Sequence, residues 1–124
     1  MLPPKTVLTL GAELVDILPD LAPALHARGF RIVSLPTAEA VPPAKDALGE
    51  TVILVFNPRG QDLARRVLQA ACPRPVPVIV IADPPDVHEY CDLMSAGAFD
   101  YFDRTAPIDR IGRAVEAAAL PAAA

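Results

Sequence analysis

The 124-residue sequence contains few basic residues, and they form no cluster. It has 11 Lys and Arg against 15 Asp and Glu, a formal net charge of −4, and its single adjacent basic pair is Arg65-Arg66. Nucleic acids and anionic membranes both bind clustered positive charge, so this pattern argues against either as the main partner. We therefore expect no direct contact with nucleic acid or membrane.

Long apolar runs are also missing. No segment approaches the roughly 20 apolar residues that a membrane-spanning helix needs, and residues 1–10 lack the apolar core and the cleavage site of a signal peptide. Hydrophobic residues make up 52% of the chain and charged residues 21%, a composition typical of a globular domain. The sequence thus predicts one cytoplasmic domain over residues 1–119, with 120–124 as a flexible tail or the start of a linker.

Cysteine is scarce, and Cys72 and Cys91 are far apart in the sequence. Only His88 lies near either of them, so no set of metal ligands can be assembled, and both thiols are expected to be reduced. Glycine-rich phosphate loops are absent, because a lone Gly11 follows the first predicted strand. Since no nucleophile has a candidate base and no two acids are placed for proton transfer, we predict neither an enzyme nor a metal or cofactor site.

What the sequence does contain is a regular alternation of short β-rich runs and amphipathic stretches. The predicted strands are 5–10, 30–35, 51–56, 76–82 and 99–102, and the predicted helices are 13–28, 37–48, 62–71, 86–95 and one that starts at 107. The runs 51–56 and 76–82 are apolar almost throughout, as expected of parallel strands buried on both faces. The alternation predicts an α/β fold, a five-stranded parallel sheet in the flavodoxin-like order 2-1-3-4-5 within a three-layer sandwich.

Individual residues indicate where several of the predicted helices and strands begin, break or end. Pro19 and Pro23 fall inside the first predicted helix, which we expect to kink or to break, because each proline removes a backbone hydrogen bond. Asp86 and Glu89 have the spacing of a capping box at the start of the fourth helix. Residues 57–60, Asn-Pro-Arg-Gly, are predicted to form a turn.

The stretch after the fourth helix has the most distinctive pattern in the chain. It reads Ala96-Gly97-Ala98-Phe99-Asp100-Tyr101, of which residues 99–101 already belong to the predicted buried strand 99–102. The cation Arg104 follows that strand. Together with residues 28–30 and 77–81, this stretch resembles the response-regulator receiver domains, the CheY-like family, and the resemblance covers nearly the whole chain. It implies the receiver fold and a role in two-component signal transduction.

The resemblance also implies where reactive residues should stand, and those positions are altered here. Receivers carry an acidic pair after the first strand, a phosphoacceptor aspartate ending the third, a hydroxyl ending the fourth and a lysine ending the fifth. The equivalents in this chain are Gly11, Ala12 and Glu13 for the acidic pair, Phe56 or Asn57 for the phosphoacceptor, Ala82 for the hydroxyl and Arg104 for the lysine. Neither Phe nor Asn can form an acyl phosphate, and one carboxylate holds Mg²⁺ poorly. We therefore predict a pocket that is inactive in phosphotransfer, with no catalytic residue.

Arg104 leaves two alternatives open. It is either a retained contact to an anion or to the backbone in the crevice, where its guanidinium offers a fixed fork of donors. Otherwise it is a surface residue paired with Asp103, Asp83 or Glu13, which would have little energetic consequence.

Tyr101 also has two interpretations. The resemblance makes it, with Ala82, an equivalent of the family's switch residues, and its ring either packs on the fourth helix or anchors an interface. Tyr90, Met94 and Tyr101 are candidates for such an interface on the helix 4–strand 5–helix 5 face, although an apolar helix stripe more often belongs to the core.

The first functional hypothesis is therefore a pseudo-receiver, an atypical response-regulator module that is not phosphorylated on aspartate and that binds a protein partner or itself. The second is a flavodoxin-like domain that binds a small molecule or an anion in the crevice near Gly11, Asn57 and Arg104.

Overall fold

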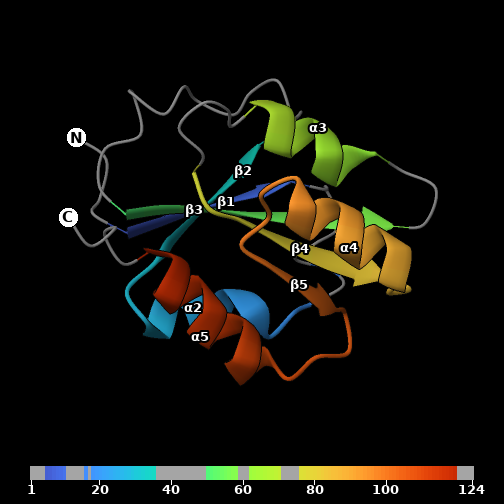
Figure 1. Cartoon of the computed structure of the whole chain (residues 1–124). Coiled ribbons are helices and arrows are strands. Elements are labelled where there is room, and N and C mark those ends of the chain that lie inside the picture. The colour runs from blue at the N-terminus through green and yellow to red at the C-terminus, as the bar shows by residue number, and fades with distance from the viewer. Residues whose placement is uncertain are drawn as a thin grey trace.

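Five parallel strands form one sheet in the order β2-β1-β3-β4-β5, which confirms the predicted fold class (Figure 1). The structure is a computed structural model that describes residues 5–10, 16, 18–35, 50–58, 62–70 and 76–119. Within these residues the elements are β1 (Lys5–Leu10), α2 (Leu21–Ala27), β2 (Arg31–Leu35), β3 (Glu50–Pro58), α3 (Leu63–Ala70), β4 (Val78–Asp83), α4 (Val87–Ser95), β5 (Asp100–Asp103) and α5 (Ile108–Ala119).

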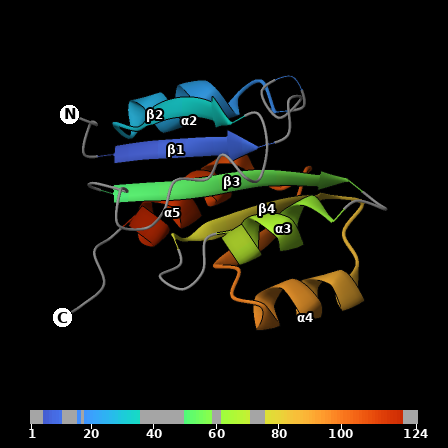
Figure 2. The ribbon, with the colours of Figure 1, turned by 90° about the horizontal axis from the view of Figure 1, so that it is seen from above.

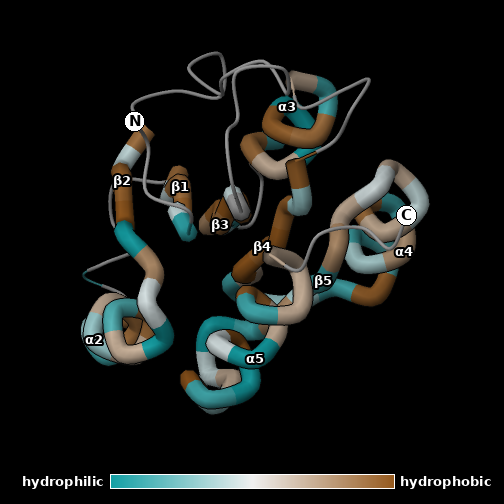
Figure 3. The backbone as a smooth tube through the Cα atoms, turned by 90° about the vertical axis from the view of Figure 1, so that its left-hand side faces the viewer, coloured by the Kyte–Doolittle hydropathy of each residue, from teal (hydrophilic) through white to brown (hydrophobic). Residues whose placement is uncertain are grey.

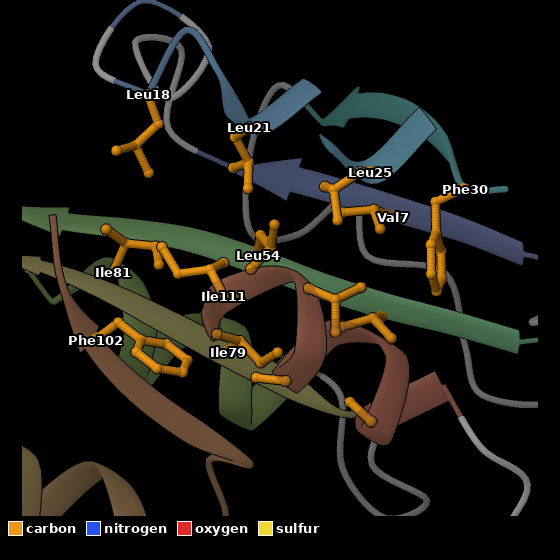
Figure 4. Close-up of a cluster of buried hydrophobic side chains, with 14 of the residues drawn as sticks. Val7, Leu18, Leu21, Leu25, Phe30, Leu54, Ile79, Ile81, Phe102 and Ile111 are labelled. Atoms are coloured by element: carbon orange, nitrogen blue, oxygen red, sulfur yellow. The ribbon is translucent and has the colours of Figure 1, made fainter. Parts of the chain in front are cut away.

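The helices cover both faces of the sheet. In Figure 1, α3 and α4 lie above it and α2 and α5 lie below. Each side has its own cluster of buried side chains: one joins the sheet to α2 and α5 (Figure 4), and the other joins it to α3 and α4. Because all strand pairs are parallel, the carboxyl ends of the strands meet at one edge, as Figure 2 shows for β1, β2 and β3.

The central strands are apolar because both of their faces are covered. Residues 52–55 of β3 and 79–82 of β4 are fully buried, and both strands are coloured as mainly hydrophobic in Figure 3. Burial on two faces is what distinguishes such strands from the alternating pattern of a sheet with one wet face. The continuous apolar runs in the sequence therefore identified the centre of the sheet correctly.

Glycine ends the two helices that precede β2 and β5. Gly29 has a φ of 86° and Gly97 a φ of 111°, values that side chains with a Cβ rarely adopt. After α2, the N–H of Phe30 donates to the carbonyl of Leu25 at 3.0 Å and that of Gly29 to His26 at 3.0 Å, the paired bonds of a Schellman stop.

The expected break near Pro19 is present. Leu18–Asp20 forms a bend and a turn, and α2 begins only at Leu21, so Pro23 falls in its first turn, where a missing N–H leaves no bond unmade. The helix predicted over 37–48, the tail 120–124 and the residues 11–13 lie outside the described residues.

Two predicted boundaries are wrong. Residues 57 and 58 belong to β3 and not to a turn, because they pair with Ala82 and Asp83 of β4. Phe99 is not a buried strand residue: β5 starts at Asp100, and the Phe99 side chain is 42% exposed. Periodicity placed Phe99 in the strand, but only Phe102 of that run is buried.

Across the described part of the chain, no helix combines the length and the apolar character that crossing a membrane requires.

Candidate functional site

The last residues of β3 turn to opposite faces of the sheet. Phe56 is 6% exposed and joins the core cluster under α2 and α5, whereas Asn57 is 3% exposed and faces α3 and α4. In the parallel register Phe56 pairs with Ile81 and Asn57 with Ala82. Of the two candidates for the phosphoacceptor equivalent, Asn57 is therefore the polar one that lies beside Ala82.

Both ends of the Asn57 amide are engaged. Its Oδ1 accepts a hydrogen bond from the backbone N–H of Ala64 at 3.1 Å, and its Nδ2 donates to Glu89 Oε2 at 3.2 Å. The side chain thereby joins the end of β3 to the first turn of α3 and to α4. An amide suits this place because it both donates and accepts, whereas an ionised carboxylate only accepts.

Tyr101 of β5 completes a polar network over the end of β4. Its hydroxyl donates to Glu89 Oε1 at 2.7 Å and accepts from the backbone N–H of Asp86 at 3.1 Å. Burial raises the pKa of Tyr101 to about 12, and the Glu89 carboxylate acts in the same direction. The phenol is thus protonated, and able to donate, throughout the physiological pH range.

Half of the predicted capping box is present. Asp86 is the N-cap of α4, and its Oδ2 accepts from the N–H of Glu89 at 3.2 Å. The reciprocal bond, from the Asp86 N–H to the Glu89 carboxylate, is replaced by the Tyr101 hydroxyl that stands between them. Local sequence spacing identified the cap, but it could not show that a residue of β5 would take the second position.

A polar hollow of about 200 Å³ lies beside this network, between α3 and α4. Its lining includes Asn57, the carboxylates of Asp62, Asp86, Glu89 and Asp92, and the guanidinium of Arg65. Arg65 approaches Asp92 at 3.9 Å across the two helices. Within the described residues no three His, Cys, Asp or Glu side chains are grouped as metal ligands. Sequence reasoning missed this hollow, although Asp62 and Asp86 each stand just before a helix that follows a central strand.

Arg104 pairs with Asp83, one of the three acids that the sequence left open. Arg104 Nη1 lies 3.0 Å from Asp83 Oδ2, and the two side chains are 45% and 39% exposed. Such an exposed pair contributes about 0–1 kcal/mol to stability. The guanidinium therefore stands at the end of β4. Glu13, which shares the predicted acidic position with Gly11 and Ala12, lies outside the described residues.

The three candidate interface residues do not share one environment. Tyr90 is 45% exposed and stacks edge-on against Tyr101, with ring centroids 5.5 Å apart. Met94 and Tyr101 are half-buried against the core cluster beneath α3 and α4. The large hydrophobic side chains exposed on the described residues are instead Val87, Tyr90 and Phe99. Val87 and Tyr90 are three residues apart on α4, and we call these two residues the α4 surface. The sequence analysis missed Val87 and placed Phe99 in the core.

Comparison with known proteins finds similarity in structure alone. No family model and no curated protein matches the sequence. Among solved structures, FixJ-N is 25% identical with a TM-score of 0.67, and the match covers 99% of this chain and 100% of that one. A response regulator from Thermotoga maritima is 18% identical (TM-score 0.69, 94% and 98% covered), and an orphan response regulator of H. pylori is 16% identical (TM-score 0.69, 96% and 100% covered). The chain therefore has the receiver fold over nearly its whole length.

Proposed function

We propose that this chain, a receiver-like module by fold, is a pseudo-receiver that is not phosphorylated on aspartate and that acts by binding a protein. The observation that carries the proposal is Asn57. Its buried amide stands beside Ala82 at the end of β3 and is bonded to both Ala64 and Glu89. A neutral amide has no carboxylate oxygen, so Asn57 cannot form the acyl phosphate that phosphorylation on aspartate requires.

The neighbouring positions support the same conclusion. Ala82 has no hydroxyl to donate to a phosphoryl oxygen, and Arg104 is paired with Asp83 at the end of β4. Among the described residues no group of side chains is arranged to hold Mg²⁺, which favours an octahedron of oxygen ligands. We propose in addition that the module is not an enzyme and uses no cofactor.

The α4 surface is the proposed contact surface, on the helix 4–strand 5–helix 5 face. Val87 is 75% exposed and Tyr90 45%, whereas Phe99, 42% exposed, lies beyond the end of α4. Tyrosine offers a large contact area with few rotatable bonds, which is why it is enriched where binding energy concentrates. The proposed occupant is a protein partner or a second copy of this chain, and the proposal includes a cytoplasmic location.

Phosphorylation is tested by incubating the full chain with acetyl phosphate and Mg²⁺ and measuring its intact mass. We expect no change in mass under conditions in which an ordinary receiver, run in parallel, gains one phosphoryl group. A gain of one phosphoryl group by this chain that is abolished when one aspartate is replaced by asparagine would refute the proposal.

Self-association is tested by light scattering over a range of protein concentrations. If a second copy occupies the α4 surface, Tyr90→Ala lowers the mean mass at high concentration, whereas the exposed control His88→Ala on the same helix does not. A wild-type mass that stays monomeric at all concentrations would exclude a second copy as the occupant.

The second candidate, a domain that binds a small molecule or an anion, has one observation in its favour, the hollow of about 200 Å³ beside Asn57. Thermal-shift measurements across nucleotides, flavins and acyl phosphates test it, because a ligand that binds only the folded state raises the melting temperature. A specific, saturable shift would favour this candidate over the pseudo-receiver.

A further inference from the structure

The carboxylate of Glu89 connects two strands that are not neighbours in the sheet. Its Oε2 accepts from Asn57 of β3 at 3.2 Å, and its Oε1 accepts from Tyr101 of β5 at 2.7 Å. In the sheet order β4 lies between these strands. Glu89 therefore bridges the carboxyl end of β4, with one oxygen bonded to each flanking strand.

The start of α4 depends on the same bridge. The backbone N–H of the N-cap residue, Asp86, donates to the Tyr101 hydroxyl at 3.1 Å, and that hydroxyl in turn donates to Glu89. These hydrogen bonds lead from the amide at the end of β3, through Glu89 and Tyr101, to the backbone N–H of the N-cap residue that precedes α4. The end of β3 and the start of α4 are therefore connected by hydrogen bonds.

Apart from the edge-on contact of Tyr90 with Tyr101, the first turn of α4 has little apolar packing. Leu93, near the end of the helix, is its one buried residue. Val87 and His88 in the first turn are exposed, and Tyr90 is 45% exposed. The hydrogen bonds of Glu89 and Tyr101 therefore act together with the Asp86 cap and the Tyr90–Tyr101 contact to position the first turn, and with it Val87 and Tyr90 of the α4 surface.

We propose that Glu89 is a latch that holds the α4 surface in one position, set by Asn57 and independent of any phosphoryl group. One consequence of the latch, that a binding surface is permanently presented, rests on the proposed function. The hydrogen bonds that form the latch can be tested in the isolated chain. Glu89 acts as a positioning residue, through Tyr101 and Asp86, and touches no reacting atom.

The first test is amide hydrogen exchange of the full chain, followed by NMR. In Glu89→Ala the backbone amides of residues 86 and 89, at the start of α4, should exchange about tenfold faster than in wild type. The reason is that a hydrogen bond to a charged group is lost. The matched control is Asp92→Ala, which removes the same charge from the same helix and should leave those amides unchanged. Equal exchange in Glu89→Ala and wild type would overturn the proposal.

Tyr101→Phe keeps the inference testable if Glu89→Ala does not fold. It removes one hydroxyl and retains the ring that packs against Tyr90. The Asp86 amide, which donates to that hydroxyl, should exchange about tenfold faster, with amides at the Leu93 end of the helix unaffected. Protection of Asp86 that survives in Tyr101→Phe would show that the bond network does not hold the helix start.

The second readout is ionisation of the Tyr101 phenol, followed by ultraviolet absorbance in a Tyr90→Phe background. The wild-type pKa of about 12 should fall in Glu89→Ala, because a carboxylate that accepts from the phenol has been removed, while burial keeps the pKa above 10. An unchanged midpoint would overturn the latch. Neither test involves phosphorylation or a partner, so the latch and the proposed function can fail separately.

Discussion

Asn57 shows why the identity of one side chain matters at the end of β3. Its amide accepts from Ala64 and donates to Glu89, so it satisfies an acid and a backbone N–H at once. An aspartate there would lose the donor and would place a carboxylate about 3 Å from the carboxylate of Glu89. The site as built therefore disfavours the residue that aspartyl phosphorylation requires.

We predict that Asn57→Asp lowers the free energy of unfolding at pH 7 by about 1–3 kcal/mol, through the lost hydrogen bond and the like-charge contact. Urea denaturation measures the loss. The control is Asn57→Ala, which removes the same bonds without adding charge and should be less destabilising at neutral pH. The excess loss in the aspartate variant should shrink at acid pH, where protonation removes the repulsion. An Asn57→Asp variant as stable as wild type at pH 7 would contradict this account.

The raised pKa of Tyr101 predicts that the stability of the protein falls at alkaline pH. Burial raises its pKa in the folded chain from 10 to about 12, so the folded state holds the phenolic proton more tightly than the unfolded chain does. This contribution is fully present below pH 10 and is lost as the pH rises from 10 through 12. In urea denaturation the stability of wild type relative to Tyr101→Phe should fall over that interval. A constant difference between the two proteins would show that the phenol ionises equally in both states.

At the scale of elements, the side chain of Arg28 links α2 to α5 in addition to the apolar cluster that the two helices share. Arg28, which follows α2, forms ion pairs with Asp109 at 2.8 Å and with Glu116, both on α5. Its guanidinium lies over Gly112, where an added Cβ would be 2.8 Å from Arg28 Cζ. The glycine thus leaves space for the arginine, at the expense of the helix propensity of α5.

A double-mutant cycle tests this packing. In an Arg28→Ala background, Gly112→Ala should stabilise the protein by about 1 kcal/mol, the difference in helix propensity between the two residues. With Arg28 present the same substitution displaces the guanidinium from its ion pairs, and the gain should disappear. Urea denaturation of the four proteins gives the coupling. Equal gains in both backgrounds would mean that Arg28 does not occupy the space over Gly112.

The elements also show how far the sequence could predict the structure. Apolar runs identified β3 and β4 because burial on both faces leaves a continuous signal, and glycine marked the ends of α2 and α4. The bonds of Glu89 could not be predicted in the same way. Its partners lie 32 and 12 residues away in the sequence, and they meet it only once α4 is docked across the end of β4. Phe99 was misplaced because pattern alone does not indicate where strand pairing begins.

For the molecule as a whole, the central strands tie its two cores together. Neighbouring residues of β4, such as Ile79 and Val80, point into the clusters on opposite faces of the sheet, and both are fully buried. A substitution that destabilises one cluster should therefore also destabilise the other, because β3 and β4 belong to both. We expect the chain to unfold in one cooperative transition.

Ile79→Ala should accordingly lower the free energy of unfolding by about 3 kcal/mol, the usual cost of truncating a fully buried isoleucine. Circular dichroism, which reports the whole chain, and tyrosine fluorescence, which reports α4 and β5, should show coincident urea transitions. The control, Ile32→Ala in the half-buried edge strand β2, should cost less. Two separate transitions would show that the clusters melt independently.

Eight of the nine side chains of α4 are at least partly exposed, because Leu93 is the one that is buried. The outer face of this helix is therefore free to vary in sequence with little loss of stability, provided that Glu89, Leu93 and Met94 are kept. Recognition can diverge here while the scaffold stays constant. A library randomised at the outward positions of α4 should yield mostly folded proteins that differ in what they bind.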